Sequence, residues 1–192
     1  MNLRSLLSLS LSSLCAACII VDGGDDAASD ESTGTPADSS GSADESTGAD
    51  PGFDADEVIA MAATYATTLE KISDQPFASQ HGAADMVGVY VNSEAAALFR
   101  TLDPEAPVEV DLPEGTLIVK EHFDDAGAFS GFLLMYRGPE GYAPMTGDWF
   151  WAATNAGGDT LTAGASGGVD FCISCHTPAP SFVFGVAADN QT

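Results

Sequence analysis

The sequence predicts a single α+β domain over residues 53–192, with a predominantly antiparallel β-sheet and a few helices. Two observations lead to this fold class. Short segments rich in β-branched and aromatic residues recur between clusters of Gly, Pro, Asn and Asp, which is typical of strands joined by turns. Helical periodicity is confined to two segments, and about 140 residues are enough for one domain with a hydrophobic core.

The first helix is expected to begin after Asp54 and to run to about Ser73. Asp54 can act as its N-cap, and Glu57 follows three positions later, as in a capping box. A second, short helix is expected over residues 92–99, where a polar residue can cap its start. Apolar residues recur at helical spacing along the first helix, namely Val58, Met61, Ala62, Tyr65, Leu69 and Ile72.

Strands are expected where β-forming residues cluster. Turns should reverse the chain at 138–141 and at 155–158, which are rich in Gly, Pro and Asn. Such short connections join antiparallel neighbours. The predicted strands are 86–91, 116–123, 131–136, 148–154 and 160–162.

The protein carries a net charge of −24. Residues 1–52 contain nine acids and one base, so residues 53–192 keep 20 acids and four bases, a charge of −16. This charge argues against nucleic acid and anionic membrane surfaces as partners. It would steer a basic redox partner protein towards the domain, although solubility in a saline medium is an equally simple reason for it.

The N-terminus predicts export to the periplasm or cell envelope. Residues 1–18 have a basic residue, Arg4, followed by an apolar Leu/Ser-rich stretch and small residues, as in a signal peptide too short to span a bilayer. The Ala-Ala-Cys ending at Cys18 resembles a lipoprotein processing site, at which Cys18 would be lipidated. The alternative is an ordinary secretory peptide cut nearby. Residues 19–52 are acidic and small, which predicts a disordered tether.

The run Cys172-Ile173-Ser174-Cys175-His176 has the spacing of c-type haem attachment. In that chemistry both thiols bond to one haem, and the imidazole of the following residue reaches its iron. The motif therefore predicts one covalent haem c, with His176 as the proximal ligand. Because the motif follows the predicted sheet, we expect the C-terminal segment to hold the haem against one sheet face.

Three other chemistries use similar cysteine spacing. A dithiol redox centre normally lies in a βαβ unit, which nothing before Phe171 resembles. A zinc site needs about four ligands, and the remaining cysteines, Cys15 and Cys18, lie in the export segment. A small disulfide would leave His176 without a role.

A sixth iron ligand must lie upstream or be absent, because none of the 16 residues after His176 is Met. His81 lies in a loop-like stretch typical of a surface histidine. His122 can either line the haem pocket or face solvent. Side chains expected mainly in the core, with one or two aromatic rings packing on the haem, are Met86, Met135, Met145, Phe123, Phe132, Trp149, Phe150 and Trp151.

Four segments, in this order, resemble the cytochrome P-460 family, which includes the cytochromes c′-beta. The resemblance covers residues 77–185 and implies a largely antiparallel sheet with helices. It also implies a five-coordinate haem c whose distal face is vacant. The segments are Gly88-Val89-Tyr90-Val91-Asn92, residues 113–121 (PEGTLIVKE), residues 147–151 (GDWFW), and the haem motif with Phe182-Val183-Phe184.

The resemblance singles out Lys120. In cytochromes P-460 the lysine of the Val-Lys-Glu strand is bonded covalently to the porphyrin edge, whereas the c′-beta type lacks this cross-link. Strand alternation places Lys120 with Ile118 and His122 on one face. The opposite face is more apolar and is expected to meet the core, so Lys120 can equally be an ordinary solvent-facing lysine.

The function classes that follow are an enzyme and a binding protein. The enzyme would be a haem oxidoreductase that oxidises hydroxylamine or a related small nitrogen species. The binding protein would be a c′-beta-like module that captures nitric oxide or a similar diatomic gas without turnover. Electron transfer is a third class, and a homodimer is a possible assembly. Some family members carry a distal carboxylate near the hairpin that holds Glu140 and Asp148, but the local sequence departs from that pattern and leaves the catalytic base unassigned.

Overall fold

The computed structural model describes residues 52–79, 81, 84 and 86–192. The predicted signal peptide, the lipidation site Cys18 and nearly all of the acidic tether lie outside these residues. Among the described helices, none has the length and apolar character needed to cross a membrane.

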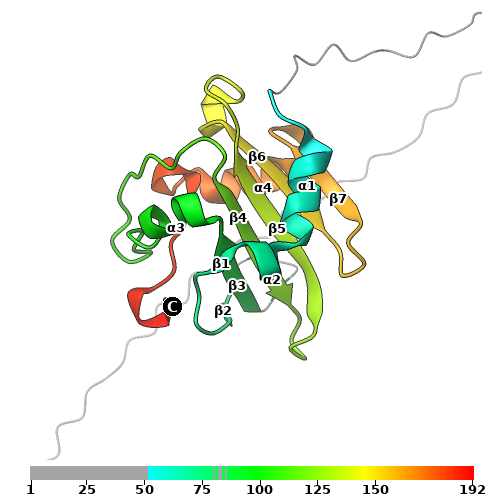
Figure 1. Cartoon of the computed structure of the whole chain (residues 1–192), viewed down its shortest axis with the longest axis vertical. Coiled ribbons are helices and arrows are strands. Elements are labelled where there is room, and N and C mark those ends of the chain that lie inside the picture. The colour runs from blue at the N-terminus through cyan, green and yellow to red at the C-terminus, as the bar shows by residue number, and fades with distance from the viewer. Residues whose placement is uncertain (1–51, 80, 82–83, 85) are drawn as a thin grey trace, which may run out of the picture. The chain divides into compact units, whose positions relative to one another are not determined.

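The fold is an antiparallel sheet of seven strands with helices on both of its faces (Figure 1), which confirms the predicted α+β class. The strand order is β1-β3-β4-β5-β6-β7, and the short β2 also pairs with β3. The central strand β4 pairs with β5 along its whole length and with β3 from Ile118 to Phe123. The strands are β1 (Glu70–Lys71), β2 (Phe77–Ala78), β3 (Met86–Val91), β4 (Leu117–Phe123), β5 (Phe129–Arg137), β6 (Trp149–Thr154) and β7 (Thr160–Gly164).

The five predicted strands are all confirmed, with ends shifted by one or two residues. The two short strands β1 and β2 were not predicted. Four short 3₁₀ helices lie in the connections of the described chain: η1 (Pro144–Thr146), η2 (Gly167–Val169), η3 (Pro180–Phe182) and η4 (Ala188–Asn190).

The first helix ends earlier than predicted. Asp54 caps α1 (Ala55–Ala63) by accepting from the backbone N–H groups of Asp56 and Glu57. The chain then breaks into α2 (Tyr65–Thr68) and turns into β1, so the predicted end near Ser73 is wrong. Threonine hydroxyls cause this break: the side chains of Thr64, Thr67 and Thr68 donate to backbone carbonyls three or four residues back, which competes with regular helix.

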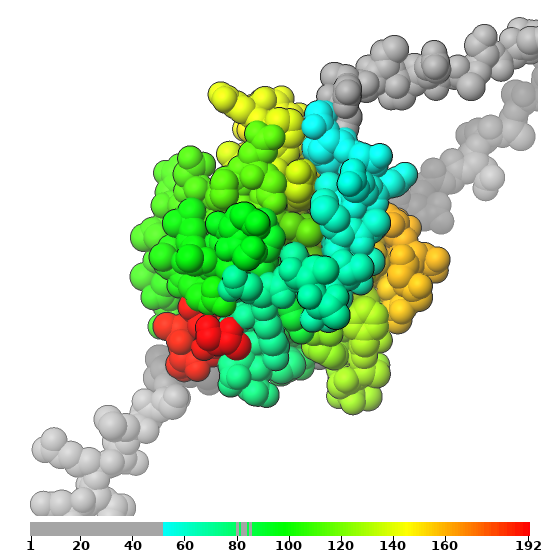
Figure 2. Space-filling view, viewed as in Figure 1, coloured from blue at the N-terminus to red at the C-terminus, as the bar shows by residue number. Residues whose placement is uncertain are grey.

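Two cores lie on the two faces of the sheet. On one face, α1 and α2 cover Leu117 and Val119 of β4, as Figures 1 and 2 show from the front. On the other face, Ile118 packs with α3 (Ser93–Phe99), α4 (Asp170–His176) and the C-terminal segment. The C-terminus is tied to the chain after β1, because the N–H of Thr192 donates to the Ile72 carbonyl over 2.8 Å.

Most of the predicted core residues are buried, but Met145 is not. Its side chain is 90% exposed. Met145 lies in η1, in the connection between β5 and β6, where a Pro starts a tight turn and no element covers the side chain. The aromatic residues Phe132, Trp149, Phe150 and Trp151 are all buried, as predicted.

Candidate haem site

Helix α4 carries the whole cysteine motif at its C-terminal end. Side chains three and four positions apart share one helix face, so Cys172, Cys175 and His176 project to the same side. Both cysteines are free thiols, Cys172 buried and Cys175 exposed. Burial raises the pKa of Cys172 to about 11.

His176 is held in the orientation that a metal-bound histidine usually has. Its ring is 5% exposed, and Nδ1 lies 2.7 Å from the carbonyl oxygen of Phe182. Metal-bound imidazoles almost always donate the N–H of the second nitrogen to such an oxygen. Nε2 has no hydrogen-bond partner among the described residues. Burial, followed by the neighbouring Lys120, lowers the pKa of His176 to about 4, which keeps the ring neutral.

The Phe182 carbonyl reaches His176 through an unusual backbone turn. Ser181 and Phe182 have φ angles of 55° and 61°, a left-handed conformation that costs non-glycine residues free energy. Two hydrogen bonds stabilise the turn. The indole N–H of Trp149 donates to the Ser181 carbonyl over 3.0 Å, and the Val110 N–H donates to the Ser181 hydroxyl over 3.0 Å.

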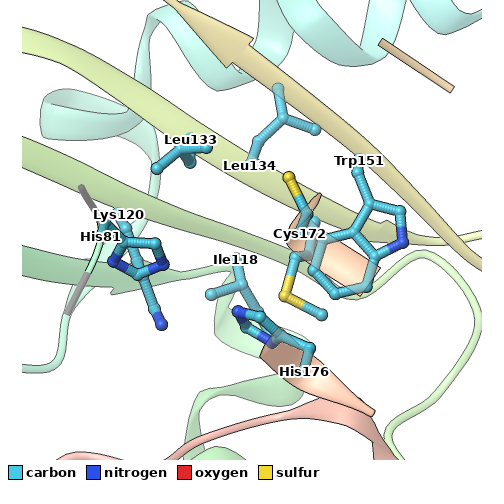
Figure 3. Close-up of a pocket in the computed structure, with 9 residues that line it drawn as sticks. His81, Ile118, Lys120, Leu133, Leu134, Trp151, Cys172 and His176 are labelled. Carbon is cyan, nitrogen blue, oxygen red and sulfur yellow. The ribbon is translucent and has the colours of Figure 1, made fainter. Parts of the chain in front are cut away.

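Two cavities border the motif, and both are lined by His81, Lys120 and His176. Figure 3 shows the smaller of them. The larger has a volume of about 320 Å³ and includes Cys175 and Phe184, a size in the range of small-molecule sites. The smaller, of about 30 Å³, includes Cys172. Its remaining lining is apolar: Ile118, Leu133, Leu134, Met135 and Trp151.

Lys120 lies in the middle of β4, opposite Val89 of β3 and Leu133 of β5. Its strand face is not a solvent face, because Ile118 and His122 on the same face are 2% and 5% exposed. The expectation of an ordinary solvent-facing lysine is therefore wrong. Burial lowers the pKa of the Lys120 ammonium to about 8.

All three histidines of the protein gather here, although they are far apart in the sequence. The ring centroids of His81 and His122 are 5.2 Å apart, and those of His81 and His176 are 6.2 Å apart. His81 is half-buried and lines both cavities, so the prediction of a surface histidine is wrong. His122 is buried, and the solvent-facing alternative for it is wrong as well.

The carboxylates near the β5–β6 hairpin do not line either cavity. Asp148 is buried, and its Oδ1 accepts from the Ala143 N–H, so it holds the connection between β5 and β6 together. Glu140 is exposed in the same connection. Sequence reasoning missed Ser79, which bonds to His81, and the carbonyl of Phe182.

The donor set fits a c-type haem. Two thiols and one imidazole come from a single helix face, and the imidazole has its Nδ1 occupied and its Nε2 free. The resemblance to the cytochromes P-460 rests on the quoted segments alone: no protein-family model matches this chain, and no curated protein matches it either.

Proposed function

We propose that this protein is a mono-haem c-type cytochrome of the cell envelope, with its haem bonded to Cys172 and Cys175 and with His176 as the proximal ligand. The observation that carries the proposal is that α4 brings its two cysteines and its histidine to the border of the cavities. One helix supplies both thiols and an imidazole whose Nδ1 lies 2.7 Å from the Phe182 carbonyl. A ligating histidine needs this arrangement, because the hydrogen bond fixes the ring and leaves Nε2 for the metal.

The proposed reaction is oxidation of hydroxylamine or a related small nitrogen species on the face of the haem opposite His176. The resemblance implies that the iron which meets this substrate is five-coordinate. The haem would supply the coordination site and accept the electrons. The chain supplies apolar walls that exclude water, with Ile118, Leu133 and Trp151 among them. Oxidation also releases protons and electrons, so a redox partner protein must take the electrons away.

Lys120 is the proposed third covalent link to the haem. With a pKa of about 8, roughly a tenth of the amine is uncharged at pH 7, and the uncharged amine is the form that bonds to carbon. Such a link would join Nζ to a porphyrin carbon in place of one N–H and one C–H bond. Two electrons would pass to an oxidant such as a peroxide, with release of two protons, once when the protein matures.

A c′-beta-like protein that binds nitric oxide without turnover is the second candidate. The placement of the carboxylates favours it, because neither Glu140 nor Asp148 lines the cavities. No carboxylate of the described residues lines either cavity, and a site without such a base would bind an apolar diatomic gas more readily than it would deprotonate hydroxylamine.

The proposed location follows from the N-terminal sequence. Residues 1–18 would direct export, lipidated Cys18 would anchor the chain, and residues 19–52 would act as the tether. The charge of −16 on residues 53–192 favours a basic redox partner over nucleic acid.

The test begins with the purified holoprotein. Haem should stay with the polypeptide in acidified organic solvent, and its mass should rise by one haem. The double variant C172S/C175S should lose all haem in the same extraction. Ser174→Ala is the matched control, because Ser174 lies between the two cysteines, is exposed and bonds only to the Phe171 carbonyl. If the wild type releases its haem into the solvent, the proposal is wrong.

The same preparation separates the two candidates. In the enzyme, proteolysis should yield one haem species that carries both the Cys172–Cys175 peptide and the Lys120 peptide. Lys120→Ala should then abolish hydroxylamine oxidation with an added electron acceptor. A haem attached to the cysteine peptide alone, in a protein that binds nitric oxide but does not oxidise hydroxylamine, establishes the second candidate instead.

A further inference from the structure

The imidazoles of His81 and His176 both border the cavity drawn in Figure 3, and both also line the larger one. Their ring centroids are 6.2 Å apart, and the ring planes are inclined by 35°. A metal–imidazole nitrogen bond is about 2.0–2.1 Å long, so two imidazoles on opposite faces of one metal ion have centroids about 6.4 Å apart. The observed separation is the one expected if both imidazoles bound one metal ion, and that ion would then have no room for a further ligand between itself and His81.

The Nδ1 atom of His81, like that of His176, lies within hydrogen-bond distance of an oxygen atom, here a hydroxyl that can donate or accept. Nδ1 of His81 lies 2.9 Å from the Ser79 hydroxyl oxygen, and the His81 backbone N–H donates to the same oxygen over 2.9 Å. A hydroxyl oxygen can accept two hydrogen bonds. Ser79 can therefore accept from Nδ1–H and leave the Nε2 lone pair free, as the Phe182 carbonyl does for His176. Nε2 of His81 has no hydrogen-bond partner among the residues that the structure describes.

His122 does not share these properties. It lines neither cavity, and no oxygen among the described residues holds either of its ring nitrogens. Its ring centroid lies 5.2 Å from that of His81. Of the two histidines that the sequence offered as a sixth ligand, the geometry selects His81.

We propose that His81 is the second axial ligand of the haem iron in the resting protein, that Ser79 positions it, and that a small ligand must displace it to reach the iron. This inference rests on the proposed haem site. It changes the expected resting state from five-coordinate and high-spin to six-coordinate and low-spin. The five-coordinate iron implied by the resemblance would then exist only while His81 is dissociated, and the resting haem would suit electron transfer.

The optical and electron paramagnetic resonance spectra of the purified full-chain holoprotein test the proposal. The wild type should be low-spin, and His81→Ala should be high-spin with unchanged haem content. Added imidazole should restore the low-spin spectrum of His81→Ala, because it fills the vacated position. Nitric oxide should bind to His81→Ala at least tenfold faster than to the wild type. Ser79→Ala should show a mixed-spin spectrum, because its His81 ring is no longer held.

His122→Ala is the matched control, since it removes the other imidazole next to His81. Its spectrum should remain low-spin. A wild-type protein that is high-spin at neutral pH, with haem covalently attached, overturns the axial role of His81 and leaves the proposed function intact. A low-spin spectrum that survives His81→Ala also overturns it. Absence of covalent haem instead overturns the proposed function itself.

Discussion

The two faces of strand β4 differ in how their polar groups are satisfied. On the face covered by α1 and α2, the Glu121 carboxylate accepts from the Tyr65 hydroxyl over 2.7 Å and from the Tyr90 hydroxyl over 3.3 Å. On the opposite face, His122 Nε2 is buried and has no hydrogen-bond partner within the described part of the chain. The neighbouring imidazoles of His81 and His176 each have one nitrogen held and one without a partner among the described residues.

This difference separates a structural network from a binding site. Buried polar groups are nearly always hydrogen-bonded, so a group of unpartnered ones needs an explanation such as a missing ligand or water. The Glu121 network is complete and needs no ligand. The histidine face, which also carries Lys120, has imidazole nitrogens without a partner among the residues that the structure describes. Substitutions on the first face should therefore change stability, and those on the second should change the haem.

The largest effect on stability is expected for Glu121→Leu. The change removes the acceptor of two tyrosine hydroxyls and leaves both without their partner, which costs about 3 kcal/mol. The free energy of unfolding, from denaturant titration of the holoprotein, should fall by that amount. The haem spectrum should not change, because Glu121 points away from the cavities. A spectral change as large as that of His81→Ala would remove the distinction between the faces.

Sequence patterns predicted the sheet well because strand formation depends on local residue choice. β-branched and aromatic residues mark β3 to β6, and Gly or Asn marks their turns. Alternation correctly grouped Ile118, Lys120 and His122 on one face. It failed to show that both faces are covered, because that depends on α4 and the C-terminal segment packing behind the sheet.

The candidate site was predictable only where the chemistry is local. Cys172, Cys175 and His176 lie within five residues, so their spacing alone indicates haem attachment. The position of His81 depends on contacts with residues about 40 and 95 positions away in the sequence, and no local pattern encodes it. The Phe182 carbonyl depends on positive φ angles at two non-glycine residues, which residue type does not signal.

A smaller effect is expected for Tyr65→Phe, which removes only one hydrogen bond to Glu121. Stability at pH 7 should fall by about 1–2 kcal/mol. Tyr136→Phe is the matched control, because the Tyr136 hydroxyl has no hydrogen bond to a described residue, and it should cost less. Equal losses in the two variants would show that the Tyr65–Glu121 bond adds nothing.

Tyr65 also gives a pH dependence with a definite sign. Burial and Glu121 raise the pKa of Tyr65 above its ordinary value of 10. Above pH 10 the unfolded chain therefore releases this proton while the folded chain keeps it, so stability falls as pH rises. The fall should be shallower in Tyr65→Phe, as denaturant titrations between pH 9 and pH 11 would measure. An identical slope in both proteins contradicts the raised pKa.

The smallest effect is expected for two tryptophans of β6 on the sheet face that carries the candidate haem site. They differ in whether a buried polar group has a hydrogen-bond partner. Trp149 and Trp151 are 0% and 2% exposed. The indole N–H of Trp149 donates to the Ser181 carbonyl, whereas that of Trp151 has no partner among the described residues. Replacing either with Phe removes the same volume, so the difference between the variants isolates the hydrogen bond. Trp149→Phe should be less stable than Trp151→Phe by about 1 kcal/mol.

Trp149→Phe should also shift the reduction potential of the haem, because the Ser181 turn presents the Phe182 carbonyl to His176 and this hydrogen bond tunes the proximal ligand. If Trp151→Phe is the less stable variant, the N–H of Trp149 does not hold the turn, and the packing of Trp151 on His176, with ring centroids 4.8 Å apart, matters more to the site.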